Sequence, residues 1–303
     1  MLLRITHETH YRYSAPVEIQ PHLLRFHPRN DGSQTTQSFQ LHLDPKPVGF
    51  TEQLDLEDNL VQFTWFDGAH LELSIKVATT VNTARRNPFD FLKPHSGLSL
   101  DQLYHPAEQT RLQRYLMRDQ PFCSDDQVRQ MACQIAKASG GDPVRFLIDL
   151  NQEICNQIEL EHRDSGDPFT PQETLGRGRG ACRDTAVLFI DACRSTGIAA
   201  RFASGYHLNE DPDDSNELHG WVEAYLPNAG WRGFDPSVGI AVADEHVTIA
   251  TASSPRDTFP VTGNYCGQAT PTMETQVAVQ KLPEADRKFH RPKSFGEKRS
   301  LLA

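Results

Sequence analysis

The spacing of apolar residues changes near residue 85, and this change limits the folds that the chain can adopt. Before it, runs such as Leu71–Val77 largely alternate apolar and polar residues, as strands with one buried face do. Similar runs lie at 41–43 and 61–66, and turn formers such as Asp67-Gly68 separate them. We therefore expect residues 1–85 to form a β-rich domain, built as a small antiparallel sandwich.

After a predicted linker at residues 86–105, apolar residues recur at helical spacing. Ser124-Asp125-Asp126 is typical of a helix start, and Gly140-Gly141 of a helix end. Asp142-Pro143 then supplies a cap and a first-turn proline for a second helix. A third apolar helix begins near Cys182 and ends at Gly197, after which strands return. The second part of the chain therefore mixes helices and strands.

The C-terminal end of the sequence is polar and basic. Residues 280–303 carry seven Lys or Arg against three acidic side chains and few large apolar ones. We therefore predict a polar basic tail over residues 268–303, either disordered or laid over the surface.

The overall charge restricts the possible partners. The chain has 30 basic and 40 acidic residues, a formal charge of −10. A nucleic-acid binder normally has a basic balance or face, so neither nucleic acid nor an anionic membrane is an expected partner. No run approaches the roughly 18 apolar residues of a spanning helix, and the start lacks the pattern of a secretory signal. We expect a cytoplasmic location.

Six cysteines are present, and no pair has CxxC spacing, which favours free thiols. Cys182 differs from the others because the glycine-rich segment 176–180 runs directly into its helix. A helix N-terminus favours an anion and lowers a thiol pKa, and the Cys182 N–H could point into an oxyanion site. Arg179 could bind an anionic substrate group or simply be solvated.

Two residues downstream of Cys182 could act together with its thiol. His219 stands at the beginning of a predicted strand that ends at Pro227, and Asp235 follows 16 residues later, as 235 − 219 shows. That gap fits a hairpin that brings the two side chains together. His219 would take the thiol proton and return it to a leaving amine, and Asp235 would fix the imidazole tautomer. We predict that Cys182, His219 and Asp235 form a catalytic triad.

These motifs resemble the transglutaminase-like superfamily, in a bacterial subgroup with a β-rich N-terminal domain. The resemblance rests on Gly180–Asp184, His219–Glu223, Gly233–Pro236, Arg201–Tyr206, Tyr11–Pro16, Leu23–Arg29 and His70. It implies an α+β fold with a papain-like core, in which the cysteine helix packs on an antiparallel sheet. The domains expected are 1–85, the linker 86–105, a catalytic core at 106–267 and the tail 268–303.

The resemblance also implies a function. Family chemistry is acyl transfer from amide or peptide bonds through a thioester, to water as in a peptidase or amidase, or to an amine as in a transglutaminase. Water is slightly favoured because it is the default acceptor. The alternative is a catalytically silent protein-binding module. A protein or peptide substrate is implied, and genes for ATP-grasp-like enzymes often lie near those of the family, which makes such an enzyme a candidate partner.

Some residues carry weaker expectations. Trp221 and Tyr206 could line the substrate cleft, or belong to the core. The sequence departs from the family pattern at Gly220, where alanine is usual, at Asp58, where glycine is frequent, and in the acidic loop 209–216. His7 and His10 lack a third ligand, and no zinc or EF-hand spacing is present, so we expect no metal and no cofactor.

Overall fold

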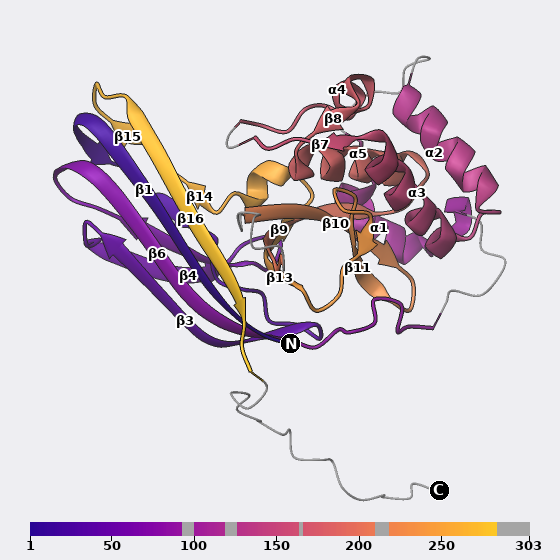
Figure 1. The fold of residues 1–303 in the computed structure, drawn as a ribbon, viewed down its shortest axis with the longest axis horizontal. Coiled ribbons are helices and arrows are strands. Elements are labelled where there is room, and N and C mark those ends of the chain that lie inside the picture. The colour runs from indigo at the N-terminus through magenta and orange to yellow at the C-terminus, as the bar shows by residue number, and fades with distance from the viewer. Residues whose placement is uncertain (93–99, 119–125, 164–165, 210–217, 284–303) are drawn as a thin grey trace, which may run out of the picture.

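The computed structural model describes residues 1–92, 100–118, 126–163, 166–209 and 218–283, and Figure 1 shows a β-rich region beside a core of helices on a sheet. The predicted α+β class is confirmed. The predicted features at 93–99, 124–125 and 210–216, and the tail beyond 283, lie outside these residues. The helices are η1 (Leu100–Gln102), α1 (Pro106–Leu116), α2 (Gln127–Ala138), α3 (Pro143–Gln157), α4 (Pro171–Arg177), α5 (Cys182–Ser195) and η2 (Pro255–Thr258).

The N-terminal region is made of two antiparallel sheets. One has the order β15-β1-β6-β3 with β16 also paired to β1, and the other has the order β14-β2-β5-β4. Leu73 and Ile75 of the first sheet share a buried cluster with Leu24 of the second, which agrees with the expected sandwich. The strands are β1 (Leu2–Ile19), β2 (His22–Leu24), β3 (Gln34–Asp44), β4 (Gly49–Leu54), β5 (Leu60–Trp65), β6 (Ala69–Thr83), β14 (Val261–Thr262), β15 (Tyr265–Cys266) and β16 (Pro271–Lys281).

The C-terminal strands correct the predicted tail. Residues 271–281, assigned to a tail from the sequence, form β16, which pairs antiparallel with β1 from Leu3 to Tyr13 (Figure 1). Residues 261–266, assigned to the core, pair with β2 and β1. The N-terminal sheets are therefore built from both ends of the described chain. The strand β16 has no apolar alternation to reveal it, because most of its side chains are exposed.

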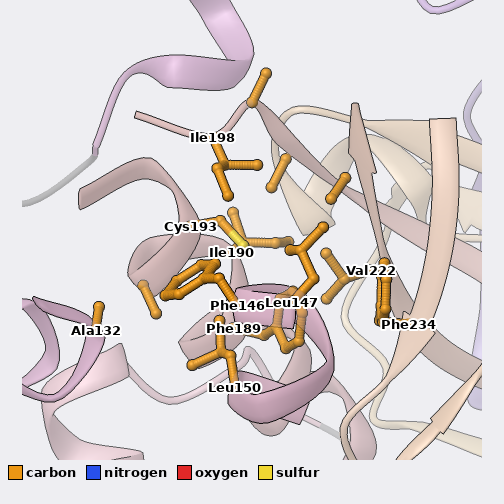
Figure 2. Close-up of a cluster of buried hydrophobic side chains, with 14 of the residues drawn as sticks. Ala132, Phe146, Leu147, Leu150, Phe189, Ile190, Cys193, Ile198, Val222 and Phe234 are labelled. Carbon is orange, nitrogen blue, oxygen red and sulfur yellow. The ribbon is translucent and has the colours of Figure 1, made fainter. Parts of the chain in front are cut away.

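The core places α5 on a five-stranded antiparallel sheet of order β12-β11-β10-β9-β13. Phe189 of α5 stacks on Phe234 of β11 with ring centroids 5.8 Å apart. Figure 2 shows this cluster, in which α3 contributes Phe146 and Leu147. Burial of these side chains fixes the helix on the sheet. The remaining strands are β7 (Glu159–Leu160), β8 (Arg179–Gly180), β9 (Ala200–His207), β10 (Leu218–Leu226), β11 (Gly230–Asp235), β12 (Ile240–Ala241) and β13 (His246–Ala252).

Helix boundaries follow the predicted capping residues. The Asp126 carboxylate accepts from the Arg129 N–H at 2.9 Å, and Asp142 accepts from the Val144 N–H at 2.8 Å. Gly197 has a φ of +85°, so it ends α5 in the left-handed conformation that favours glycine. None of the helices in the described ranges is both long and apolar enough to cross a bilayer.

Two buried amides of the N-terminal region hold β13, an edge strand of the core sheet. Asn59 accepts from the Thr251 N–H and donates to the Thr251 carbonyl, both at 2.9 Å. Gln34 does the same with Thr248, at 2.9 and 2.8 Å. Asp58, beside Asn59, has a φ of +60°, which explains why glycine suits this position. These bonds satisfy backbone groups along the edge of β13 and fix the segment that begins with His246.

Candidate active site

Cys182 is the first residue of α5, as the sequence predicted. Asp184, fully buried in the first turn, accepts from the Ala181 N–H at 2.8 Å and pairs with Arg163 at 2.9 Å. These contacts make Asp184 a capping residue of α5. The Cys182 thiol therefore lies at a capped helix start, where the helix dipole favours an anion.

His219 and Asp235 lie on neighbouring strands at one end of the sheet. His219 is near the start of β10 and Asp235 ends β11, so the expected hairpin brings them together. His219 Nε2 is 2.6 Å from Asp235 Oδ2. The Cys182 thiol bonds to the His219 side chain and to the Gly220 backbone. Because Asp235 occupies Nε2, the other ring nitrogen is left for the thiol. The structure brings the three predicted residues into one chain of contacts.

The three groups stabilise one another's charged forms. Burial opposes ionisation of Cys182, but the hydrogen bond and charge of His219 and the Gly220 N–H outweigh it, so the pKa of the thiol is lowered. Burial also opposes protonation of His219, yet the Asp235 carboxylate and the thiol raise the pKa of His219 well above its usual value. His219 and His246 hold the pKa of buried Asp235 well below its usual range. A thiolate and an imidazolium are thus favoured together.

The Asp235 carboxylate is held by four donors. Oδ1 accepts from the Ser237 hydroxyl at 2.6 Å and from the Ser237 N–H at 3.1 Å. Oδ2 accepts from His219 and from His246 Nε2, the latter at 3.1 Å. These four donors fix the orientation of the Asp235 carboxylate without the help of water molecules.

Sequence reasoning missed two histidines at the site. His207 ends β9 and His246 begins β13, and the sheet register pairs them directly. Their rings stack with centroids 4.2 Å apart, and the His207 ring is 5.7 Å from that of His219. Burial and the neighbouring histidines lower the pKa of His207 to about 4. Only the pairing of distant strands brings these residues together, so no local motif could have indicated them. One ligand atom from each of His207, His219, Asp235 and His246 lies within 4.8 Å of the other three.

The predicted substrate-binding residues lie in three different settings. Tyr206 is fully buried, and its hydroxyl bonds to His7 Nδ1 at 2.9 Å, so it lies between the core and the N-terminal sheet rather than facing the site. Trp221 is also fully buried and stacks on His219 at 6.1 Å, which supports the imidazole from the core. Arg179 is exposed, and its Nε lies 3.8 Å from Oε2 of Glu161. Substrate binding by Arg179 and Trp221 stays a prediction.

The other thiols have different environments. Cys193, also on α5, is fully buried, and burial raises its pKa well above the ordinary value. Cys133, Cys155 and Cys266 are free as well. A cavity of about 220 Å³ lies along α5, lined among others by Phe169, Ile190 and Arg256, but it does not include the three site residues.

A cysteine at the start of a buried helix, with histidine and aspartate on adjacent strands of an antiparallel sheet, defines the cysteine-nucleophile proteins with a papain-like core. Two protein-family models then give the family. One, for the bacterial transglutaminase-like N-terminal region, matches residues 3–82, and the other, for the transglutaminase-like superfamily, matches residues 130–236. Through these regions the chain belongs to the transglutaminase-like superfamily, as the motifs predicted. The family and the site support a cysteine-based enzyme.

The relatives of the chain include two uncharacterized mycobacterial proteins. The one from Mycobacterium leprae is 22% identical over 285 residues, covering 92% of this chain and 99% of the relative. The one from Mycobacterium tuberculosis is 25% identical over 279 residues, covering 86% of each. A crystal structure from Cytophaga hutchinsonii, described as a candidate cysteine protease, superposes with a TM-score of 0.69 and 21% identity, over 93% of this chain and 92% of that one. It shows the same fold.

Proposed function

We propose that this protein is a cysteine-nucleophile acyl-transfer enzyme that cleaves amide or peptide bonds through a thioester. One observation carries the proposal: the Cys182 thiol bonds to His219, whose Nε2 lies 2.6 Å from a buried Asp235. That arrangement favours thiolate and imidazolium, the reactive state of such enzymes.

In the proposed first step the Cys182 thiolate attacks the carbonyl carbon of the substrate amide. A C–S bond forms, and the carbonyl oxygen gains negative charge, which backbone N–H groups at the start of α5 are suited to stabilise. The C–N bond then breaks as His219 donates its proton to the leaving amine. Asp235 keeps the imidazole oriented throughout.

In the second step the acceptor attacks the thioester. We favour water as the acceptor, because the His219 side chain is 17% exposed and solvent can reach it. His219 removes a proton from water, the C–S bond breaks, and a carboxylic acid and the thiolate–imidazolium pair result. An amine in place of water would give the transglutaminase outcome with the same residues.

The test is a screen of purified protein against peptide and amide libraries, with and without an added primary amine, read by mass spectrometry. We expect cleaved products in both arms and little amine incorporation. Cys182→Ala should give no product and no covalent acyl adduct. Predominant amine incorporation would overturn the choice of water.

A second measurement separates an enzyme from a silent binding module. Treatment with iodoacetamide at pH 6 should label Cys182 faster than a free thiol peptide, since its pKa is lowered. Cys193 in the same protein serves as the internal control, because it is fully buried and its pKa is raised. Labelling of Cys182 no faster than the peptide would contradict the activated nucleophile.

A cytoplasmic location and an ATP-grasp-like partner remain proposals that accompany this function. A peptide ligase would make the class of bond that this enzyme cleaves. Fractionation of the native host, and co-purification of the tagged chain, would test the two separately.

A further inference from the structure

The end of the core sheet that holds His219 and Asp235 carries more potential metal ligands than acyl transfer requires. Strand β9 ends at His207, β10 begins beside His219, β11 ends at Asp235, and β13 begins at His246. Because neighbouring strands in this sheet are antiparallel, these four strand ends meet at one end of the sheet. The sheet thus gathers three imidazoles and one carboxylate.

These four side chains suit a transition metal. Zinc takes imidazole nitrogen and carboxylate oxygen in four-coordinate sites, with ligand atoms about 3.3 Å apart for bonds of roughly 2.0–2.1 Å. Asp235 Oδ2 already lies 2.6 Å from His219 Nε2 and 3.1 Å from His246 Nε2. All four ligand atoms fall within 4.8 Å of one another, which is near the separation that a single zinc ion requires.

Asp235 has supporting contacts of the kind that metal ligands have. Asp235 could bind through Oδ2 while the Ser237 hydroxyl and N–H hold Oδ1. The Nδ1 of buried His246 has no hydrogen-bond partner in the structure. That atom can carry the ring proton while Nε2 binds a metal. His207 and His219 are partly exposed, which gives an entry path.

We infer that His207, His219, Asp235 and His246 form a binding site for a divalent transition metal of the zinc class, whose occupation blocks acyl transfer. The metal would replace the proton that His219 shares with Asp235, releasing it to solvent. With Nε2 on the metal, Nδ1 would keep its proton, because losing it would leave an imidazolate. His219 could then no longer exchange protons with the thiol, the leaving amine or water. Metal binding itself does not depend on the proposed function.

The experiment uses chelator-treated Cys182→Ala protein, which lacks the nucleophilic thiol as a competing ligand. Titration with Zn²⁺ by calorimetry, and with Co²⁺ by visible absorption, should each show one equivalent bound. His207→Asn should weaken binding by about 100-fold or more, since even residues that only support metal ligands cost 10–100-fold. His42→Asn, the same change at an exposed position on β3, is the matched control and should bind as tightly as the parent.

A second arm measures function in the protein with Cys182 intact. Zn²⁺ should inhibit acyl transfer reversibly, and EDTA should restore the rate. The rates of His207→Asn are expressed relative to its own zinc-free rate. Half inhibition of this variant should need a higher Zn²⁺ concentration than half inhibition of the parent. The inference is overturned if Cys182→Ala binds no metal, or if His207→Asn binds as tightly as His42→Asn. Metal binding without any acyl-transfer activity would instead leave the site intact and contradict the proposed function.

Discussion

At the scale of single residues, the environment rather than the residue type decides the chemistry of a thiol. Cys182 and Cys193 belong to the same helix, and burial opposes ionisation of both. The pKa of Cys193 is raised because burial dominates. The pKa of Cys182 is lowered because His219 and the Gly220 N–H outweigh burial. A nucleophile is therefore made by its neighbours across the sheet.

The roles of those neighbours predict a ranking of variants. His219→Ala removes the proton carrier and should reduce kcat by about 10⁶, by analogy with the histidine of hydrolase triads. Asp235→Asn removes orientation and charge but keeps the shape, and should cost about 10⁴. Steady-state kinetics on a cleaved peptide, with circular dichroism to confirm folding, would measure both. A His219→Ala enzyme within tenfold of the parent would contradict the assignment.

The Asp235–His219 pair also predicts how stability depends on pH. The pKa of Asp235 is lowered on folding, so its contribution is present above about pH 3.9 and is lost as pH falls through the folded value. The pKa of His219 is raised, so its contribution is complete below about pH 6.5 and is lost as pH rises through the folded value. The free energy of unfolding should therefore differ most between the parent and Asp235→Asn from about pH 4 to 6.5.

Urea unfolding at a series of pH values would measure this difference. Ser237→Ala is the matched control, since it removes one hydrogen bond to Asp235 but no titrating group. Its effect should vary little across the same range. A difference for Asp235→Asn that is constant with pH would show that the two side chains do not ionise as a pair.

At the scale of elements, the sequence predicted the features that depend on residues close together in the chain. Asp126, Asp142 and Gly197 mark helix ends through contacts with nearby backbone, so their patterns could be recognised. The Cys–His–Asp set followed from a helix start and one hairpin. The strand β16 and the pair His207 and His246 could not be predicted in this way. The side chains of β16 are mostly exposed, and the two histidines meet through pairing between strands far apart in the chain.

The close pairing of β9 and β10 explains the departure at position 220 and gives a prediction. A Cβ on Gly220 would lie 2.6 Å from the ring of Phe202 on β9. Gly220→Ala should therefore destabilise the fold by about 1–3 kcal/mol, as overpacking commonly does. Phe202→Leu makes room at that contact, so the double variant should lose less than the sum of the single variants.

Gly205 of β9, which faces β13 on its other side, provides a stricter comparison. Its Cβ would lie 1.9 Å from the Val247 carbonyl oxygen, a backbone atom that cannot move aside. Gly205→Ala should cost more than Gly220→Ala, above about 3 kcal/mol. Thermal unfolding of the four variants would rank them. Equal losses from Gly220→Ala with and without Phe202→Leu would show that this contact does not set the cost.

At the scale of the whole molecule, the N-terminal sheets and the core share one buried cluster. Leu3 and Ile5 of β1 and Val279 of β16 pack with Tyr206 and Val247 of the core sheet. The buried amides of Gln34 and Asn59 add hydrogen bonds along β13. The N-terminal region therefore supports the strand that begins with His246, which in turn contacts Asp235.

The last strand should be part of the cooperative unit that holds this arrangement. A chain ending at residue 270 lacks β16, so it exposes the β1 edge from Leu3 to Tyr13 and loses the burial of Val279. A chain ending at residue 283 keeps both and is the matched control. Burial of one Val side chain contributes about 1.5–3 kcal/mol, so the shorter chain should unfold at clearly lower urea. Its open edge should also promote association, measurable by light scattering. If both chains unfolded at the same urea concentration, β16 would not be part of the cooperative folding unit. The tail boundary expected at residue 268 would then mark the end of that unit.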